Sequence, residues 1–255
     1  MEDSDMTNSL VDKSKARGKG VIIEPSLCLY TPRQVYNAIL NDDRIKKWLD
    51  FIANRYVPPK KYTLLLIYPC SADKPYHKSR SYKALYKTLN SIPARENKIH
   101  LATISEPYAL IPEEFYSVKD YWYDCPGLFE WFCRRYNLEY EKELADRCIE
   151  ILAECIWKFL KRNKDRYTAD IIAFIRTYTS SLTQKHDHTH RRMVELVNNE
   201  LSDNGTSRIK ILPPKDLVSQ IVSKNRFAWD MYGVAHPVAQ RYLYSVLTNY
   251  FSNNG

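Results

Sequence analysis

The chain has 255 residues, of which 44% are hydrophobic, so it can bury a full core and is expected to form one α/β domain with an extension. Its formal net charge of +8 favours a polyanionic partner such as nucleic acid, because Lys and Arg neutralise phosphates. The six cysteines lack a CxxC pair and no apolar stretch is long enough for a membrane span or a signal peptide, so the composition predicts a cytoplasmic protein without a zinc ribbon, a disulfide scaffold or membrane contact.

The beginning of the chain divides into two segments of different character. Residues 1–20 are polar and charged, with a Lys/Arg-rich stretch at residues 13–19 that glycines interrupt, which predicts a disordered basic arm. Such an arm either contacts a phosphate backbone or only keeps the chain in solution. Thr31 and Pro32 then offer a helix N-cap and a proline at the first helical position. We therefore expect a helical extension at residues 21–60, followed by an α/β catalytic core at residues 61–255.

An apolar run at residues 64–68 is typical of a buried parallel strand. A polar cluster follows directly, and α/β sheets place their ligand sites at the carboxyl ends of parallel strands. We therefore expect chemistry in this loop. The alternative is an ordinary polar turn in which Asp73 or Ser79 caps the next helix. The polar residues of the loop are Cys70, Ser71, Asp73, Lys74, Tyr76, His77 and Ser79.

Further elements follow along the chain. A helix at residues 81–89 and a strand at residues 99–104 complete a parallel crossover unit. Residues 108–126 have no clear periodicity, which predicts a long functional loop or a lid. An amphipathic helix is expected at residues 139–164, with Cys148 and Cys155 as small core residues rather than metal ligands.

Two more strands are expected at residues 169–175 and 209–212, and a last helix ends near Phe251. The fold class predicted is therefore α/β, a single domain with a short, mainly parallel sheet of about four strands flanked by helices. Between these strands, residues 185–192 contain three alternating histidines. Because the residues after them are typical of a helix, on which alternate positions point apart, we expect a polar helix start rather than a metal site. No metal and no cofactor is predicted.

The loop after the first strand resembles the signature of the archaeosine synthase family, PC-x3-KPY-x2-S-x2-H. The matching residues are Pro69, Cys70, Lys74, Pro75, Tyr76 and Ser79. Tyr82 stands where that pattern has its final His. The resemblance continues, less specifically, through Ser105-Glu106-Pro107 and Tyr123-Asp124-Cys125-Pro126.

The resemblance implies an archaeal tRNA-modifying transferase of the cytoplasm with a uracil-DNA-glycosylase-like fold. Archaeosine synthases act on tRNA that carries 7-cyano-7-deazaguanine in its D-loop, couple free lysine to the nitrile, and leave the product to a radical SAM enzyme. The implied partners are therefore tRNA, free lysine and a radical SAM enzyme. Full-length relatives also carry a PUA-type RNA-binding module that we do not find after Gly255. The core and basic arm, or a partner subunit, are then expected to bind the RNA.

Four residues of the loop are the predicted catalytic groups. Cys70 either forms a thioimide with the nitrile or only lines the pocket. Asp73 is a candidate base or an anchor for the substrate amine, Lys74 holds a phosphate or a substrate carboxylate, and Tyr76 stacks on the base or donates to it. The predicted substrate-binding residues are Pro69, Ser71, His77, Ser79, Glu106, Asp124 and His236.

Two other functions remain open at this point. Residues 73–77 are similar to the water-activating QDPYH loop of uracil-DNA glycosylases with one residue inserted, and His236-Pro237 is similar to the start of their HPS loop. In a glycosylase Asp73 would activate water, Tyr76 would wall the base pocket and His236 would stabilise the leaving base. The third possibility is an RNA-binding subunit without activity, which Tyr82 supports. In each case we expect Cys70, Asp73, Tyr76 and His236 to share one pocket.

Overall fold

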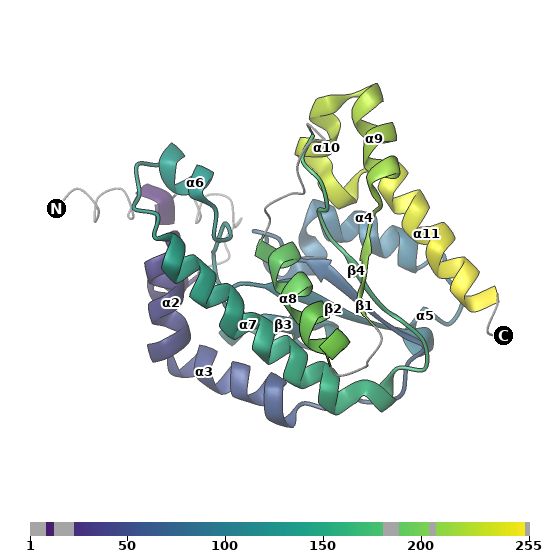
Figure 1. Cartoon of the computed structure of the whole chain (residues 1–255), viewed down its shortest axis with the longest axis horizontal. Helices are drawn as coiled ribbons and strands as arrows, with labels where there is room; N and C mark the ends of the chain where they lie inside the picture. Colours follow the sequence, from purple (N-terminus) through teal and green to yellow (C-terminus); the bar gives the residue numbers. More distant parts are fainter. Residues whose placement is uncertain (1–8, 13–22, 181–188, 204–207, 253–255) are drawn as a thin grey trace.

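A five-stranded mixed sheet forms the centre of the protein in the computed structural model, which describes residues 9–12, 23–180, 189–203 and 208–252 (Figure 1). The strand order is β3-β2-β1-β4-β5. The strands are β1 Leu64–Pro69, β2 Ile99–Ser105, β3 Ala109–Pro112, β4 Ile171–Phe174 and β5 Lys210–Leu212. Neighbouring strands pair in parallel except β2 and β3, which are antiparallel. The predicted α/β class and mainly parallel sheet are confirmed, whereas the uracil-DNA-glycosylase-like fold stays a prediction.

The number of strands corrects the sequence analysis, which expected about four. The additional strand is β3, and it lies inside the segment 108–126 that was expected to be an irregular loop. β3 has four residues, follows Pro107 closely and ends at Pro112, so the segment has the prolines expected of a loop. It is nevertheless buried along its whole length and pairs with β2 from Ala102 to Ser105. β3 therefore forms because of its pairing with β2 and its burial, and not because of a local sequence pattern.

Helices cover both faces of the sheet (Figure 1). On one side α2, α3, α7 and α8 pack together, and on the other α4 packs against α11. The helices are α2 Pro32–Asn41, α3 Asp43–Asp50, α4 Arg80–Leu89, α5 Arg95–Lys98, α6 Glu130–Arg135, α7 Lys142–Asn163, α8 Thr189–Asp203, α9 Lys215–Lys224, α10 Arg226–Tyr232 and α11 Pro237–Ser252. The long helix expected from the amphipathic pattern is α7, and Cys148 and Cys155 are buried in it as predicted.

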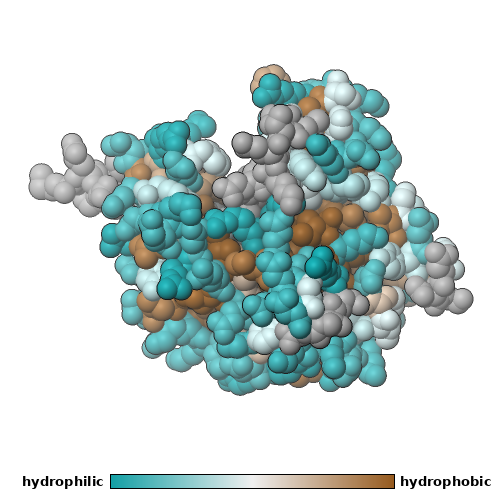
Figure 2. All heavy atoms as spheres, in the orientation of Figure 1, coloured by the Kyte–Doolittle hydropathy of each residue, from teal (hydrophilic) through white to brown (hydrophobic). Residues whose placement is uncertain are grey.

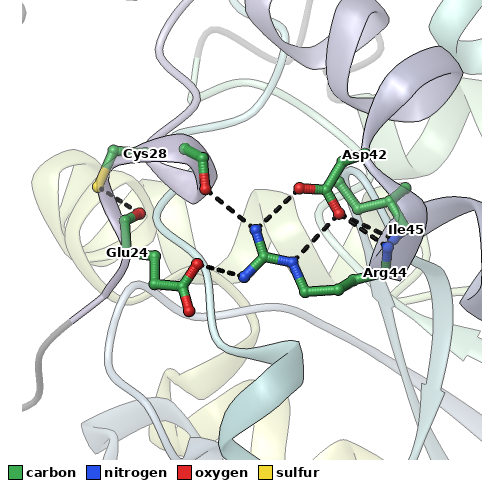
Figure 3. A network of polar contacts seen from close by, with 6 residues as sticks. Glu24, Cys28, Asp42, Arg44 and Ile45 are labelled. Carbon is green, nitrogen blue, oxygen red and sulfur yellow. Dashed lines mark hydrogen bonds and ion pairs between the residues drawn. The ribbon is translucent and has the colours of Figure 1, made fainter.

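Helix capping and ion pairs occur within residues 23–60, the described part of the predicted extension. Thr31 starts α2 with a capping box, in which its side chain accepts from Gln34 N and Gln34 accepts from the Thr31 backbone. Arg44, in α3, pairs with both Asp42 and Glu24, which ties the segment before α2 to the start of α3 (Figure 3). The hydrogen bonds from Arg44 hold the pKa of Asp42 below its usual range. Ion pairs near the surface add little to the free energy of unfolding, so their main effect here is to orient the segment before α2 relative to α3.

The first twenty residues lie mostly outside the described part of the chain, so the disordered basic arm stays a prediction. Residues 9–12 are described as helical, with Leu10 and Val11 buried. Hydrophilic side chains cover most of the face drawn in Figure 2, with hydrophobic atoms showing in patches between them. Among the described residues, every helix is too short or too polar to cross a membrane.

Candidate active site at the carboxyl ends of β1 and β2

The motif loop leaves the sheet where β1 ends, and one further bond, from Cys70 N to the Ile104 carbonyl at 3.1 Å, prolongs its pairing with β2. Lys74 folds back under the loop, where its ammonium donates to the Ser71 carbonyl at 2.6 Å. The same ammonium lies 4.2 Å from the ring centroid of Tyr123 and 4.9 Å from that of Tyr76. Lys74 is 5% exposed, and burial lowers its pKa. It therefore supports the loop from inside rather than presenting a charge at the surface.

Three side chains with acid–base and ligating groups meet beside this loop. Cys70 follows β1, Glu106 follows β2, and His190 lies in the first turn of α8. His190 Nε2 is 3.7 Å from Cys70 Sγ and 3.1 Å from Glu106 Oε2. The three candidate ligand atoms all lie within 4.8 Å of one another. The parallel pairing of β1 with β2 brings the first two together, and α8 supplies the third.

Burial makes this cluster electrostatically strong. Glu106 is 0% exposed and His190 is 2% exposed, whereas Cys70 is only half-buried. Burial disfavours both charges, but the charge and hydrogen bond of His190 hold the pKa of Glu106 below its usual value. Burial likewise acts against a charged His190, yet Glu106 and Cys70 raise the pKa of His190 to about 10. The remaining oxygen, Glu106 Oε1, is buried and has no hydrogen-bond partner among the described residues.

Tyr82 occupies the position of the missing motif histidine, on the inner face of α4. It is fully buried, and its hydroxyl donates to the Pro69 carbonyl at 3.2 Å and forms a hydrogen bond with Thr103. Its ring stacks on Tyr76 with centroids 5.2 Å apart. Tyr82 therefore supports the carboxyl end of β1 through this hydrogen bond to Pro69. Burial raises its pKa well above the usual value, so the hydroxyl stays neutral.

Tyr76 is a core residue. It is 2% exposed, and its hydroxyl bonds the Tyr123 hydroxyl at 2.9 Å, which in turn bonds Ser105. Burial raises the pKa of Tyr76 and of Tyr123 well above the usual value. The Tyr76 ring therefore supports the loop from the core, and in this structure it is too buried to stack on a base.

The other candidates of the loop divide by exposure. Ser79 caps α4, where it accepts from Tyr82 N at 3.1 Å, so the capping alternative is confirmed for this residue. Asp73 and His77 are exposed, and Pro69 and Ser71 are half-buried. The solvent edge of the loop therefore offers Cys70, Ser71 and Asp73.

Asp124 and His236 make contacts with other segments of the chain. Asp124 accepts from the Tyr30 hydroxyl at 2.9 Å and pairs through its backbone with the extension at Cys28. The neighbours of His236, Ala235 and Pro237, line a cavity of about 450 Å³ between α4 and α11. The ring of His236 contacts Tyr232 with centroids 6.3 Å apart. The pocket that His236 was expected to share with Cys70 stays a prediction.

The residue that sequence analysis set aside is His190. The tract 185–192 was expected to start a helix, and α8 does begin at Thr189, although His186 and His188 lie outside the described residues. Because alternate positions on a helix point apart, the sequence argued against a site made of all three histidines, His190 included. On a helix a single histidine can still face inward, and only the fold places its ring against Glu106.

Comparison with known proteins yields related sequences. A family model described as "Domain of unknown function (DUF5591)" matches residues 45–212. Archaeosine synthase subunit alpha of Thermococcus kodakarensis is 31% identical over 93 residues, 34% of this chain and 16% of that protein. Archaeosine synthase of Methanocaldococcus jannaschii is 29% identical over 133 residues, 52% of this chain and 20% of that protein. Archaeosine synthase subunit alpha of Thermoplasma acidophilum is 27% identical over 147 residues, 56% of this chain and 24% of that protein.

A solved structure, titled "Crystal structure of AF0587, a protein of unknown function", aligns over 72% of this chain and 48% of that chain, with a TM-score of 0.38 and 19% identity. The matched parts amount to between 16% and 24% of the length of the three curated relatives.

The fold and the site define an α/β protein in which a half-buried cysteine meets a buried glutamate and histidine at the carboxyl ends of neighbouring parallel strands. The chain belongs to the DUF5591 family and is archaeosine synthase alpha-like.

Proposed function

We propose that this chain is a tRNA-modifying enzyme of the archaeosine type that couples lysine to the nitrile of 7-cyano-7-deazaguanine in the tRNA D-loop. The names of the curated relatives support tRNA modification of this type. The observation that carries the proposal is the convergence of Cys70 with Glu106 and His190 beside the motif loop. A half-exposed thiol next to a buried acid–base pair is suited to chemistry on an unsaturated carbon.

The proposed reaction is an addition in which nothing leaves. The lysine amine nitrogen bonds to the nitrile carbon, and one amine proton moves to the nitrile nitrogen, which gives an amidine. The step needs a proton acceptor for the amine and a group that stabilises charge on the nitrile nitrogen. His190 and Glu106 lie 3.1 Å apart and can hold and pass a proton. Cys70 either forms a thioimide that the amine then displaces, or lines the pocket while the amine attacks directly.

Binding of tRNA is proposed to be electrostatic and distributed. Lys and Arg number 38 against 30 Asp and Glu over the whole chain, and four of the basic residues lie close together at positions 13–19. Affinity should therefore fall steeply as salt rises. Two of the relatives are named as alpha subunits, which supports a second subunit in the complex. We propose a radical SAM enzyme in that role and the archaeal cytoplasm as the location.

Nucleoside analysis of tRNA tests the proposed reaction. Deletion of the gene should cause the nitrile base to accumulate in tRNA, and purified protein with isotopically labelled lysine should convert that base to a lysine adduct seen by mass spectrometry. Release of a free base, with tRNA nucleosides unchanged in the deletion strain, would replace the proposal by a glycosylase.

Two variants in the loop separate the chemical routes. Cys70→Ser should abolish lysine transfer and retain tRNA binding if the thioimide forms, and Cys133→Ser, at a buried cysteine in α6, is the matched control. Asp73→Asn should reduce base excision by about 10²–10⁴-fold in a glycosylase that uses Asp73 to activate water. Full lysine transfer by Cys70→Ser would rule out the covalent route and leave direct attack by the amine.

A further inference from the structure

We propose that Cys70, Glu106 and His190 form a binding site for a divalent transition-metal cation, with Zn²⁺ as the best fit. The site would use Cys70 Sγ, Glu106 Oε2 and His190 Nε2 as ligands and leave one coordination position open. The sequence did not suggest it, because the three ligands come from three distant segments and form no short spacing motif.

The donor set matches this class of ion. Thiolate sulfur, imidazole nitrogen and carboxylate oxygen are the three ligand types that zinc takes in proteins, and catalytic zinc sites use three protein ligands and an open position. With zinc–ligand bonds of about 2.0–2.3 Å, tetrahedral geometry places ligand atoms roughly 3.3–3.6 Å apart. The 3.7 Å between Cys70 Sγ and His190 Nε2 and the 3.1 Å between His190 Nε2 and Glu106 Oε2 bracket that spacing.

The connectivity favours a shared ion over a proton relay. In a nucleophile–base–orienter triad, the nucleophile and the carboxylate bond opposite nitrogens of the imidazole. Here both Cys70 Sγ and Glu106 Oε2 approach the same nitrogen, Nε2. One N–H cannot point along both directions at good geometry. A cation placed among the three atoms satisfies all of them at once.

Burial and charge agree with a cation. Glu106 is completely buried and its second oxygen, Oε1, has no hydrogen-bond partner among the described residues. A buried carboxylate with spare acceptor capacity is costly unless a proton or a metal ion is held nearby. Cys70 is half-buried, so the cluster reaches solvent on the thiol side, which gives an ion an entry path and leaves its open position accessible.

The chemical use of the ion rests on the proposed function. A cation with an open position can bind the nitrile nitrogen of the base and draw electrons from the nitrile carbon. The lysine amine then adds to that carbon, and its proton passes to the nitrogen. In this form Cys70 is a ligand of the ion, and the amine attacks the nitrile directly without a thioimide.

Cobalt binding tests the site without any tRNA. Purified full-length chain, stripped with a chelator, is titrated with Co²⁺ alone and then with Zn²⁺ in competition. We expect saturation at a single Co²⁺ per chain, a thiolate-to-cobalt charge-transfer band, and visible bands of a four-coordinate ion that Zn²⁺ displaces. Absence of saturable binding, or binding without the charge-transfer band, would overturn the proposal.

Variants assign the ligands. Cys70→Ser should remove the charge-transfer band, and Glu106→Gln and His190→Gln should each weaken Co²⁺ binding by more than the roughly 10–100-fold that loss of an outer-shell partner costs. Cys133→Ser and His236→Gln, at a cysteine and a histidine outside the cluster, should bind like the wild type. Circular dichroism identifies any variant that fails to fold, and the wild-type spectrum still decides in that case.

The two proposals fail in different ways. If cobalt binds as described and lysine transfer is absent, the metal site stands and the proposed reaction falls. If lysine transfer proceeds in stripped protein at the rate of the zinc-loaded form, the reaction stands and the catalytic use of the ion falls.

Discussion

The two ends of strand β2 each hold a buried histidine beside a glutamate, in surroundings of opposite character. At the amino end, His100 Nδ1 bonds the Tyr167 hydroxyl at 2.6 Å and Nε2 bonds the Tyr56 hydroxyl at 3.2 Å. The ring also stacks on Tyr62 with centroids 4.8 Å apart. Glu114 lies 3.6 Å from His100 and is partly exposed. Both nitrogens of this histidine therefore bond tyrosine hydroxyls, and Nε2 also faces the Glu114 carboxylate.

At the carboxyl end, the histidine meets a thiol in place of tyrosine hydroxyls. His190 Nε2 meets a thiol and a carboxylate together, and Glu106 is buried more completely than Glu114. Hydroxyls of tyrosine hold a histidine in place, whereas a thiol and a buried carboxylate can bind a cation or exchange a proton. The His–Glu pair at the amino end is thus held by tyrosine hydroxyls, whereas the pair at the carboxyl end also meets a thiol, and we propose the chemistry at that end.

Removing the two glutamates should give the largest contrast. Glu106→Gln is expected to lower lysine transfer by about 10²–10⁴-fold, because the carboxylate that charges His190, or holds the ion, is lost. Glu114→Gln is the matched control and should keep transfer within about threefold of the wild type. The measurement is the initial rate of labelled lysine incorporation into tRNA. Equal losses in both variants would erase the functional distinction between the two ends.

Removing the amino-end histidine should affect stability instead. His100→Ala leaves the Tyr167 hydroxyl without its ring partner, whereas the Tyr56 hydroxyl keeps its bond to Glu114. A buried unsatisfied group costs about 1–3 kcal/mol, so we expect a loss of about that size in the free energy of unfolding, measured by urea denaturation. His236→Ala, at a half-buried histidine, should change it by less than about 1 kcal/mol. A stable His100→Ala variant without lysine transfer would contradict the structural role.

The sequence predicted the sheet better than the site. The apolar runs of β1 and β2 and the stripe of α7 are strong local patterns, and the structure confirms these elements. β4 and β5 are as short as β3, yet the sequence predicted both, so length does not explain why β3 was missed. β3 lies in a segment that prolines interrupt and ends at one of them, Pro112, and its pairing with β2 is a tertiary event that the local pattern does not show.

Within the site, chain position identified Cys70 and Glu106, which each follow the end of a parallel strand. It could not identify His190, because which side of a helix start faces the sheet depends on how α8 packs on α7. The motif alone also did not show which of its side chains are buried. Lys74 and Tyr76 carry reactive groups, yet both lie in the interior, where they support the loop.

A substitution at Tyr82 tests how the carboxyl ends of β1 and β2 are supported. Tyr82→Phe keeps the buried ring and removes the hydroxyl that bonds the Pro69 carbonyl and Thr103. We expect a loss of about 1–2 kcal/mol in the free energy of unfolding, the usual cost of a buried hydrogen bond. Lysine transfer should stay within about threefold of the wild type. A much larger loss of activity would show that this hydroxyl has taken over the role of the motif histidine.

The smallest effect is expected from acid titration at the amino end. Burial opposes charge on Glu114, but hydrogen bonds from His100 and Tyr56 hold its pKa below the usual value. A carboxyl whose pKa is lower in the folded state adds stability above its unfolded pKa of about 4.3 and loses it as the pH falls through the folded pKa. Glu114→Gln should therefore be less stable than the wild type near pH 7, and the difference in unfolding free energy should shrink as the pH falls below about 4.3 and through the folded pKa. Urea denaturation at several pH values measures it, and a difference that persists at low pH would mean that the carboxylate charge is not what stabilises this end of β2.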